Sequence, residues 1–342
     1  MYTNFVLVEL ISKLINYREI LDEDNTSLIF LLDYVKNLKV KFTNDILDKI
    51  KFSKKMDKLA IYCSKEIIET KSLKILDDYK SKPKIIFYEK LLSIKGIGNS
   101  LAKKLIKKYN YSNLKDIDSK LLSETQNLAI KYDKDLSEKI SYLIAKTIIK
   151  NLTETLFSGI NNDELDDILD IKLNNNLKDY LKYVYQIVFV GSFRRKLKYI
   201  SDIDCCIFVS DKFPFDEFDE YILKSYKNCY KLEQGIRNKS FLIKFNKKWI
   251  QIDFRFFDPK SKPFALLAFT GNFIFNKKLR SIAIQKGYSL SEYGLKNKKT
   301  NKFIDESFES EESIFNFLDF NYIYPEDRTF DYDTSLKKYK LN

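Results

Sequence analysis

The chain has 342 residues, of which 44% are apolar, so it can bury more than one hydrophobic core and should form two or more globular domains. Its net charge of +12 suits a polyanionic partner such as nucleic acid, although a lysine-rich solvated surface would give the same excess. Histidine is absent, which excludes histidine general bases, Ser-His-Asp triads and His-ligated zinc.

The first half of the sequence carries apolar residues at helical spacing. We expect a small helical domain over residues 1–79, a polar linker at 80–84 that contains a proline, and a second helical block over 85–158. The acidic run at 163–167 is typical of an exposed helix face.

From about residue 183 the pattern changes to short runs of β-branched and aromatic residues. These runs predict strands at residues 184–190, 203–209, 241–245 and 249–256. The sequence therefore predicts an α+β protein in which helical domains precede a mixed sheet.

The four cysteines, Cys63, Cys205, Cys206 and Cys229, show no Cys-x-x-Cys spacing and predict reduced core thiols. No basic start precedes an apolar stretch at the N-terminus, and no window approaches the ~18 apolar residues of a membrane span. We therefore expect a soluble intracellular protein, in the nucleus or the cytoplasm.

Three aspartates form the candidate catalytic centre. Asp202 and Asp204 lie two residues apart on a predicted strand, so both side chains leave the same face. Asp253 lies in another predicted strand, and neighbouring strands about 4.8 Å apart would bring it into the cluster. Oxygen ligands alone suit two Mg²⁺ ions, with Mn²⁺ as a substitute, and such a pair aligns a nucleophile with a leaving phosphate. We expect Asp202 and Asp204 to bridge both ions and Asp253 to hold one.

A Gly-Ser turn precedes this cluster, at Gly191 and Ser192, directly after an apolar strand. Such a turn at the start of a helix exposes backbone N–H groups and a hydroxyl to a phosphate, and Arg195 adds positive charge there. An Asp-x-Asp pair alone is common by chance. The combination of strand, turn, basic pair and two acids is more specific.

The sequence resembles the family X DNA polymerases of the polymerase beta type. Residues 191–195 and 201–204 are similar to the family's palm signature, residues 269–295 to its nucleotide-binding thumb and residues 314–328 to its closing segment. The resemblance, clearest over 85–330, implies a lyase-like helical domain at 1–79, a fingers-like subdomain at 85–158, a palm at 159–260 and a thumb-like subdomain at 261–342.

The resemblance also implies residue roles. Nucleotide contacts are expected from the Gly-Ser turn, Arg195 and four thumb residues, with Asn276 facing the incoming base: Gly191, Ser192, Arg195, Phe269, Thr270, Gly271, Asn276. Arg255 and Arg280 are expected to contact DNA. Phe269 could equally be a core aromatic, and Arg280 a surface charge.

Residues Ile94, Gly96, Ile97 and Gly98 look like a helix-hairpin-helix. The two glycines permit a tight turn whose backbone N–H groups face a DNA phosphate, with Na⁺ or K⁺ held by nearby carbonyls. Four lysines follow between residues 103 and 108, which favours duplex binding without sequence preference.

Several features depart from the family pattern. Gln251 stands where the family usually has a basic residue, and Ala268 replaces the usual tyrosine, so sugar discrimination does not carry over. The stretch 157–180 is longer than expected. Lys65 is a candidate for the family's lyase amine, because Cys63 falls near the expected position, with a surface lysine as the alternative.

Together these features predict a DNA-templated DNA polymerase that adds dNTPs to a primer 3′ end and fills short gaps in repair. Expected partners are gapped or primer-template DNA and a DNA ligase, with the protein a monomer. Two alternatives stay open: another nucleotidyltransferase, RNA-tailing or template-independent, and a DNA-binding protein without catalysis.

Overall fold

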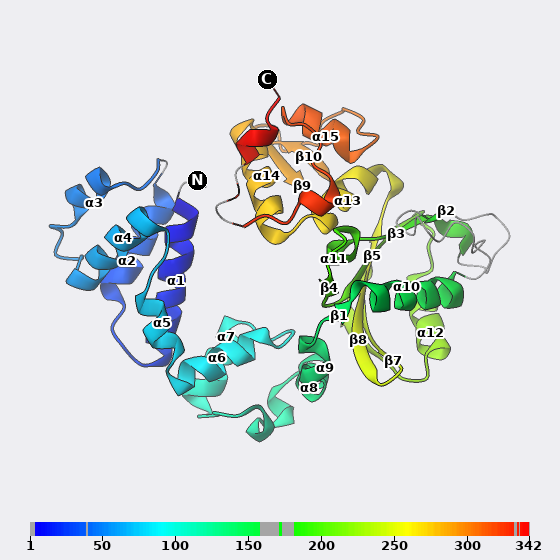
Figure 1. Ribbon diagram of the computed structural model, residues 1–342, viewed down its shortest axis with the longest axis horizontal. Helices are drawn as coiled ribbons and strands as arrows, with labels where there is room; N and C mark the ends of the chain where they lie inside the picture. The colour runs from blue at the N-terminus through cyan, green and yellow to red at the C-terminus, as the bar shows by residue number, and fades with distance from the viewer. Residues whose placement is uncertain are drawn as a thin grey trace. The chain divides into compact units, whose positions relative to one another are not determined.

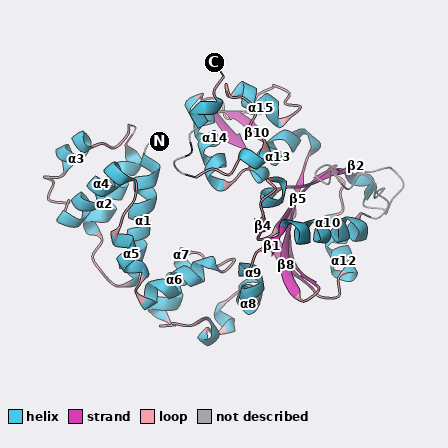
Figure 2. Ribbon diagram, viewed as in Figure 1, coloured by secondary structure: helices cyan, strands magenta, loops and turns pink. Residues whose placement is uncertain are grey.

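The computed structural model describes residues 4–38, 40–157, 171–172, 181–331, 334 and 336–341. It divides into two compact units, Met1–Lys131 and Tyr132–Asn342 (Figure 1). Unit 1 is helical and unit 2 combines helices with a mixed sheet, which confirms the α+β class (Figure 2). The finer division at residues 79, 158 and 260 stays a prediction. Among the described helices, none is long and apolar enough to cross a membrane.

Unit 1 consists of short helices: α1 Phe5–Ile20, α2 Thr26–Asn37, α3 Asn44–Ile50, α4 Lys58–Thr70, α5 Ile75–Lys80, α6 Pro83–Ser93, α7 Asn99–Lys103 and α8 Glu124–Lys131. The linker expected at residues 80–84 stays a prediction; in the structure only Ser81 and Lys82 separate α5 from α6. Pro83 begins α6, a position where proline's fixed φ suits a helix and its missing N–H is not needed.

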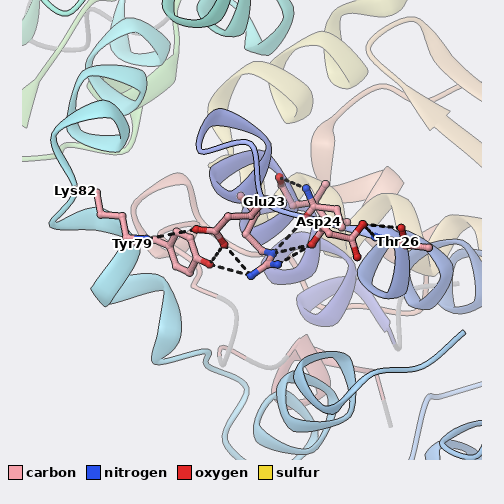
Figure 3. Close-up of polar contacts among 8 residues, drawn as sticks. Glu23, Asp24, Thr26, Tyr79 and Lys82 are labelled. Atoms are coloured by element: carbon pink, nitrogen blue, oxygen red, sulfur yellow. Dashed lines mark hydrogen bonds and ion pairs between the residues drawn. The ribbon is translucent and has the colours of Figure 1, made fainter.

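A polar cluster ties the end of α1 to the α5–α6 junction (Figure 3). Arg18 lies 2.9 Å from the Glu23 carboxylate and donates to the Tyr79 hydroxyl at 3.0 Å. The Tyr79 hydroxyl in turn donates to Glu23, and the Lys82 ammonium lies 4.3 Å from the Tyr79 ring centroid. Residues before and after position 80 therefore belong to one packed unit.

Unit 2 is built on a six-stranded sheet of order β2-β3-β5-β8-β7-β6. Its strands are β2 Ile171–Lys172, β3 Val184–Phe189, β5 Ile203–Val209, β6 Cys229–Gln234, β7 Asn238–Phe245 and β8 Lys248–Phe257. The predicted strands are thus confirmed. Strand β5 runs antiparallel to β3 and parallel to β8, and the remaining described pairs are antiparallel. Most of the stretch 157–180, with its acidic run, lies outside the described residues.

The two faces of the sheet have different partners. Ile203, Cys205 and Ile207 of β5 belong to the large core that helices α10 Tyr142–Leu156 and α12 Phe215–Ser225 complete. The alternate residues Cys206 and Phe208 pack in a second cluster with α13 Lys262–Thr270. Because side chains alternate along a strand, Asp204 emerges on the α13 side.

Short elements complete unit 2. They are α9 Asp133–Ser137, the β-ladder of β1 Ile140–Ser141 with β4 Tyr199–Ile200, and α11 Gly191–Arg194. The C-terminal part contains α14 Phe273–Gln285, the hairpin of β9 Tyr288–Ser291 and β10 Gly294–Asn297, and α15 Glu311–Phe317. These last elements share their own apolar core with α13.

Candidate active site

The three predicted aspartates lie together in unit 2. Asp202 immediately precedes β5, Asp204 lies within it, and the parallel register places Asp204 beside Asp253 of β8. One carboxylate oxygen from each residue lies within 4.8 Å of the others. This spacing lets one cation contact all three side chains, as oxygen-ligated divalent ions require.

The electrostatics of this cluster favour a bound cation. Burial raises the pKa of the Asp204 carboxyl to about 7, and the neighbouring Asp202 and Asp253 carboxylates add to the rise. Arg255 and Arg195 oppose it without overcoming it. Three acids crowded together with little solvent repel one another, and a divalent cation would relieve that repulsion.

The Asp253 carboxylate is held by polar neighbours on its own face of the sheet. The Gln251 amide nitrogen lies 2.9 Å from both carboxylate oxygens, and the hydroxyl of Ser240, opposite on β7, contacts one of them. Arg255 lies at 4.0 Å. Gln251 therefore orients the third carboxylate by hydrogen bonds where the family pattern would put a charge.

Gly191 provides the space that Asp204 occupies. It adopts a φ of +63°, and a Cβ built on it would lie 2.1 Å from Asp204 Oδ2. Sequence analysis assigned this glycine to the phosphate-binding turn and missed its contact with the carboxylate. A glycine at the end of a strand next to an Asp-x-Asp strand was the available signal.

Comparisons with known proteins agree with this arrangement. A nucleotidyltransferase domain model matches residues 171–275, and a DNA polymerase beta thumb model matches residues 265–329. Residues 171–329 of the chain are thus similar to the nucleotidyltransferase and thumb domains of DNA polymerases of the polymerase beta type.

Two relatives and one solved structure define the likeness further. The chain is 24% identical to a protein named DNA polymerase lambda from Arabidopsis thaliana over 94% of its length, but spans only 61% of that protein. It is 29% identical to the Repair DNA polymerase X of African swine fever virus over 46% of this chain and 95% of the viral protein. The fold matches Leishmania infantum polymerase beta, solved as a ternary P/T complex, with a TM-score of 0.57 at 23% identity, covering 73% of this chain and 100% of the other.

Of the residues expected to bind phosphate, Ser192 lies in the short helix α11 and is half-buried. Arg195 donates to the Thr270 carbonyl at 2.7 Å. Burial lowers the pKa of Arg195, the nearby Asp204 carboxylate opposes the shift, and Arg328 adds to it. The Arg195 Nε–H is buried without a hydrogen-bond partner, so this guanidinium has a donor left for an anion.

The thumb residues have mixed surroundings. Phe269 lies half-buried against the second core cluster, 5.6 Å from the Phe257 ring, which supports its reading as a core aromatic. The Asn276 amide donates to the Ala268 carbonyl at 2.5 Å, so it is turned toward its own backbone. Arg280 is half-exposed and lies 3.5 Å from the Glu292 carboxylate.

A buried ion network that sequence analysis missed joins α11 to the thumb. Glu311 accepts from Arg194 at 2.6 Å and from Arg328 at 2.5 Å, and Arg194 also donates to the Thr270 hydroxyl. Burial alone would raise the pKa of Glu311, but the Arg328 and Arg194 guanidinium groups hold it below the ordinary value. Arg328 is 0% exposed, and no periodicity in the sequence predicts that burial.

The predicted hairpin of unit 1 forms as a turn between α6 and α7. Gly96 has a φ of +81°, and the Ile97 amide donates to the Ile94 carbonyl at 3.1 Å. Gly98 is extended and caps α7. The Gly96 carbonyl accepts from Gln126 at 2.6 Å, so this oxygen already has a partner where we predicted a monovalent ion.

Two of the lysines that follow the hairpin have internal partners. Lys103 bonds Glu19 of α1 at 2.6 Å, and Lys107 lies 2.5 Å from the carboxylate of Asp22, just after α1. They therefore hold α1 against the hairpin, so fewer of the four lysines have a positive charge available for DNA phosphates. Lys65, the candidate lyase amine, lies exposed on α4 beside buried Ser64.

Proposed function

We propose that this protein is a DNA-templated DNA polymerase that adds dNTPs to a primer 3′ end and fills short gaps during repair. The observation that carries the proposal is the triad Asp202, Asp204 and Asp253 on two neighbouring strands, with the Gly-Ser turn against it. Similarity to the polymerase beta thumb model and to a relative named a repair DNA polymerase supports DNA as the substrate.

The carboxylates fit divalent cations, because they offer only oxygen ligands and because burial, together with their mutual repulsion, raises the pKa of Asp204. Two Mg²⁺ ions, or Mn²⁺ in their place, would be held by Asp202 and Asp204, with Asp253 on one of them, and would supply Lewis-acid activation and charge neutralisation. Gln251 and Ser240 keep the Asp253 carboxylate oriented.

The turn that follows β3 would bind the triphosphate. Backbone N–H groups at Gly191 and Ser192, together with the Arg195 Nε–H that has no hydrogen-bond partner, would donate to the phosphate oxygens. The network through Arg194 and Glu311 ties this turn to the thumb, so Thr270 and Gly271 would line the sugar at a fixed distance from it. The residues that would bind the phosphates and those that would position the sugar are thus joined by hydrogen bonds and ion pairs.

The test is primer extension with Asp204→Ala and Asp253→Ala, using Glu217→Ala on the exposed surface of α12 as the matched control. We expect both aspartate variants to lose addition while duplex affinity survives, because the acids serve chemistry and other residues hold DNA. Near wild-type extension by either variant would remove the proposed site. Reactions without template, or with an RNA primer, separate this function from other nucleotidyltransferases.

Short gaps are the proposed preferred substrate. Lysines in the segment 49–55 would hold a downstream 5′-phosphate, so a gap is bound at both ends and its effective concentration rises. Deletion of residues 1–79 would cut through packed unit 1, so charge reversal of Lys54 and Lys55 is the cleaner experiment. Equal extension of gaps with and without a 5′-phosphate at low salt would contradict this role. A DNA ligase as partner and a monomeric state stay predictions.

Lyase activity at Lys65 also stays a prediction. A Schiff-base amine works best when it is partly desolvated, and Lys65 lies exposed on α4. Borohydride trapping on DNA with a 5′-deoxyribose phosphate measures the activity directly. A trapped adduct that persists in Lys65→Ala would assign the chemistry to another amine.

A further inference from the structure

The turn between α3 and α4 exposes an aromatic ring in the middle of a lysine-rich segment. Phe52 is 83% exposed, the highest value among the exposed large hydrophobic residues of the described chain. We call residues 49–58 the basic turn. Five lysines and three aspartates lie between Asn44 and Lys58, a net charge of +2.

The basic turn holds Phe52 outward. The Ser53 amide donates to the Ile50 carbonyl at 2.9 Å, and the Met56 amide donates to the Ser53 carbonyl at 2.9 Å. Met56 is 8% exposed and anchors the turn to the core of unit 1. The ring is therefore displayed on an ordered backbone, and its exposure is not the result of a frayed end.

Cations surround the aromatic rings of this region. The Lys51 ammonium lies 5.0 Å from the Phe52 ring centroid, and the Lys55 ammonium lies 5.5 Å from that of Phe30. Lys51 also bonds Asp48 at 2.7 Å. Alternating rings and ammonium groups fit a ligand that carries both flat π faces and phosphates.

We propose that Phe52 stacks on an unpaired base of single-stranded DNA while the lysines of the basic turn contact the adjacent phosphates. Every base has a π face, so this contact reads no sequence, and it favours unpaired strands because duplex bases are already stacked. The inference rests on the proposed function only in taking DNA as the ligand: a gap exposes unpaired template bases.

Exposed Tyr62 of α4 provides the contrast within the same unit. It is 52% exposed, and the acidic side chain of Glu66, with a smaller contribution from Asp78, raises its pKa. Unlike Phe52, it has an acidic neighbour at its ring. Tyr62→Ala is therefore a matched control for the loss of an exposed aromatic ring.

The experiment uses the full chain and two fluorescent 16-nucleotide probes, oligo-dT and an abasic strand with the same phosphates but no bases. We expect Phe52→Ala to weaken oligo-dT binding by about fivefold to 100-fold, the range that one stacked base supplies, and to leave abasic binding unchanged. Tyr62→Ala should match the wild type. Phe52→Trp should retain affinity, and its fluorescence should be quenched by oligo-dT only, above the background of the single native Trp249.

Unchanged oligo-dT affinity in Phe52→Ala would overturn the proposal. An equal loss of affinity for oligo-dT and for the abasic strand would overturn it too, because the contact would then not involve the bases. Extension of an open primer-template by the same wild-type preparation separates the two hypotheses. If the protein extends the primer but oligo-dT binding does not depend on Phe52, only the stacking proposal is refuted. If oligo-dT binding depends on Phe52 but the protein adds no nucleotides, only the polymerase function is refuted.

Discussion

Gly191→Ala should slow the proposed nucleotide addition by about 100-fold without unfolding the protein. An alanine would have to hold a φ of +63°, which costs an L-residue about 1–2 kcal/mol. Its Cβ would also lie 2.1 Å from Asp204 Oδ2 and 3.0 Å from Asp204 Cγ, so the carboxylate must move by roughly 1 Å. A displacement of that size costs about 100-fold in rate when it misplaces a catalytic group.

The matched control is Gly287→Ala. Gly287 has a φ of +89°, but a Cβ there would meet nothing within 4 Å, so alanine adds backbone strain without displacing a neighbour. Thermal unfolding should show modest destabilisation of both variants, small against a typical total of about 5–15 kcal/mol. Single-turnover extension should fall only for Gly191→Ala. Normal turnover by Gly191→Ala, or an equal loss in Gly287→Ala, would refute the steric argument.

Three further substitutions test individual contacts. Gln251→Leu removes both hydrogen bonds to the third carboxylate and should slow single-turnover extension about 10-fold to 100-fold with unchanged DNA affinity; an unchanged rate would deny it a positioning role. Glu311→Gln leaves buried Arg328 uncompensated and should lower the free energy of unfolding by about 3–5 kcal/mol at neutral pH. Because the pKa of Glu311 is held below 4.5, its stabilisation exists above that value and is lost as pH falls through the lower folded-state pKa, so chemical denaturation of the variant should show a flatter acid limb. Gly96→Ala, at a φ of +81°, should weaken primer-template binding in a filter or anisotropy assay, whereas Gly98→Ala, in open space and extended, should not.

The sequence alone determined the local features of this protein. The runs of β-branched and aromatic residues at 203–209 and 249–256 predict strands. Because side chains alternate between the two faces of a strand, the same runs put Asp202 and Asp204 on one face. The glycines at 96 and 98 likewise predict a turn between helices. Each of these conclusions depends on neighbours within a few positions.

Only the tertiary structure decided which distant residues meet. The parallel register of β5 with β8 puts Asp253 beside Asp204, and no local pattern sets that register. Arg18 and Glu23 likewise bind Tyr79 from more than 50 positions away, and no local pattern near residue 79 predicts that contact. The sequence left Lys103 and Lys107 available for DNA, and only the structure shows that they pair with Glu19 and Asp22. A contact between residues remote in the chain depends on how whole elements pack, and that packing is a property of the folded unit, not of any window of sequence.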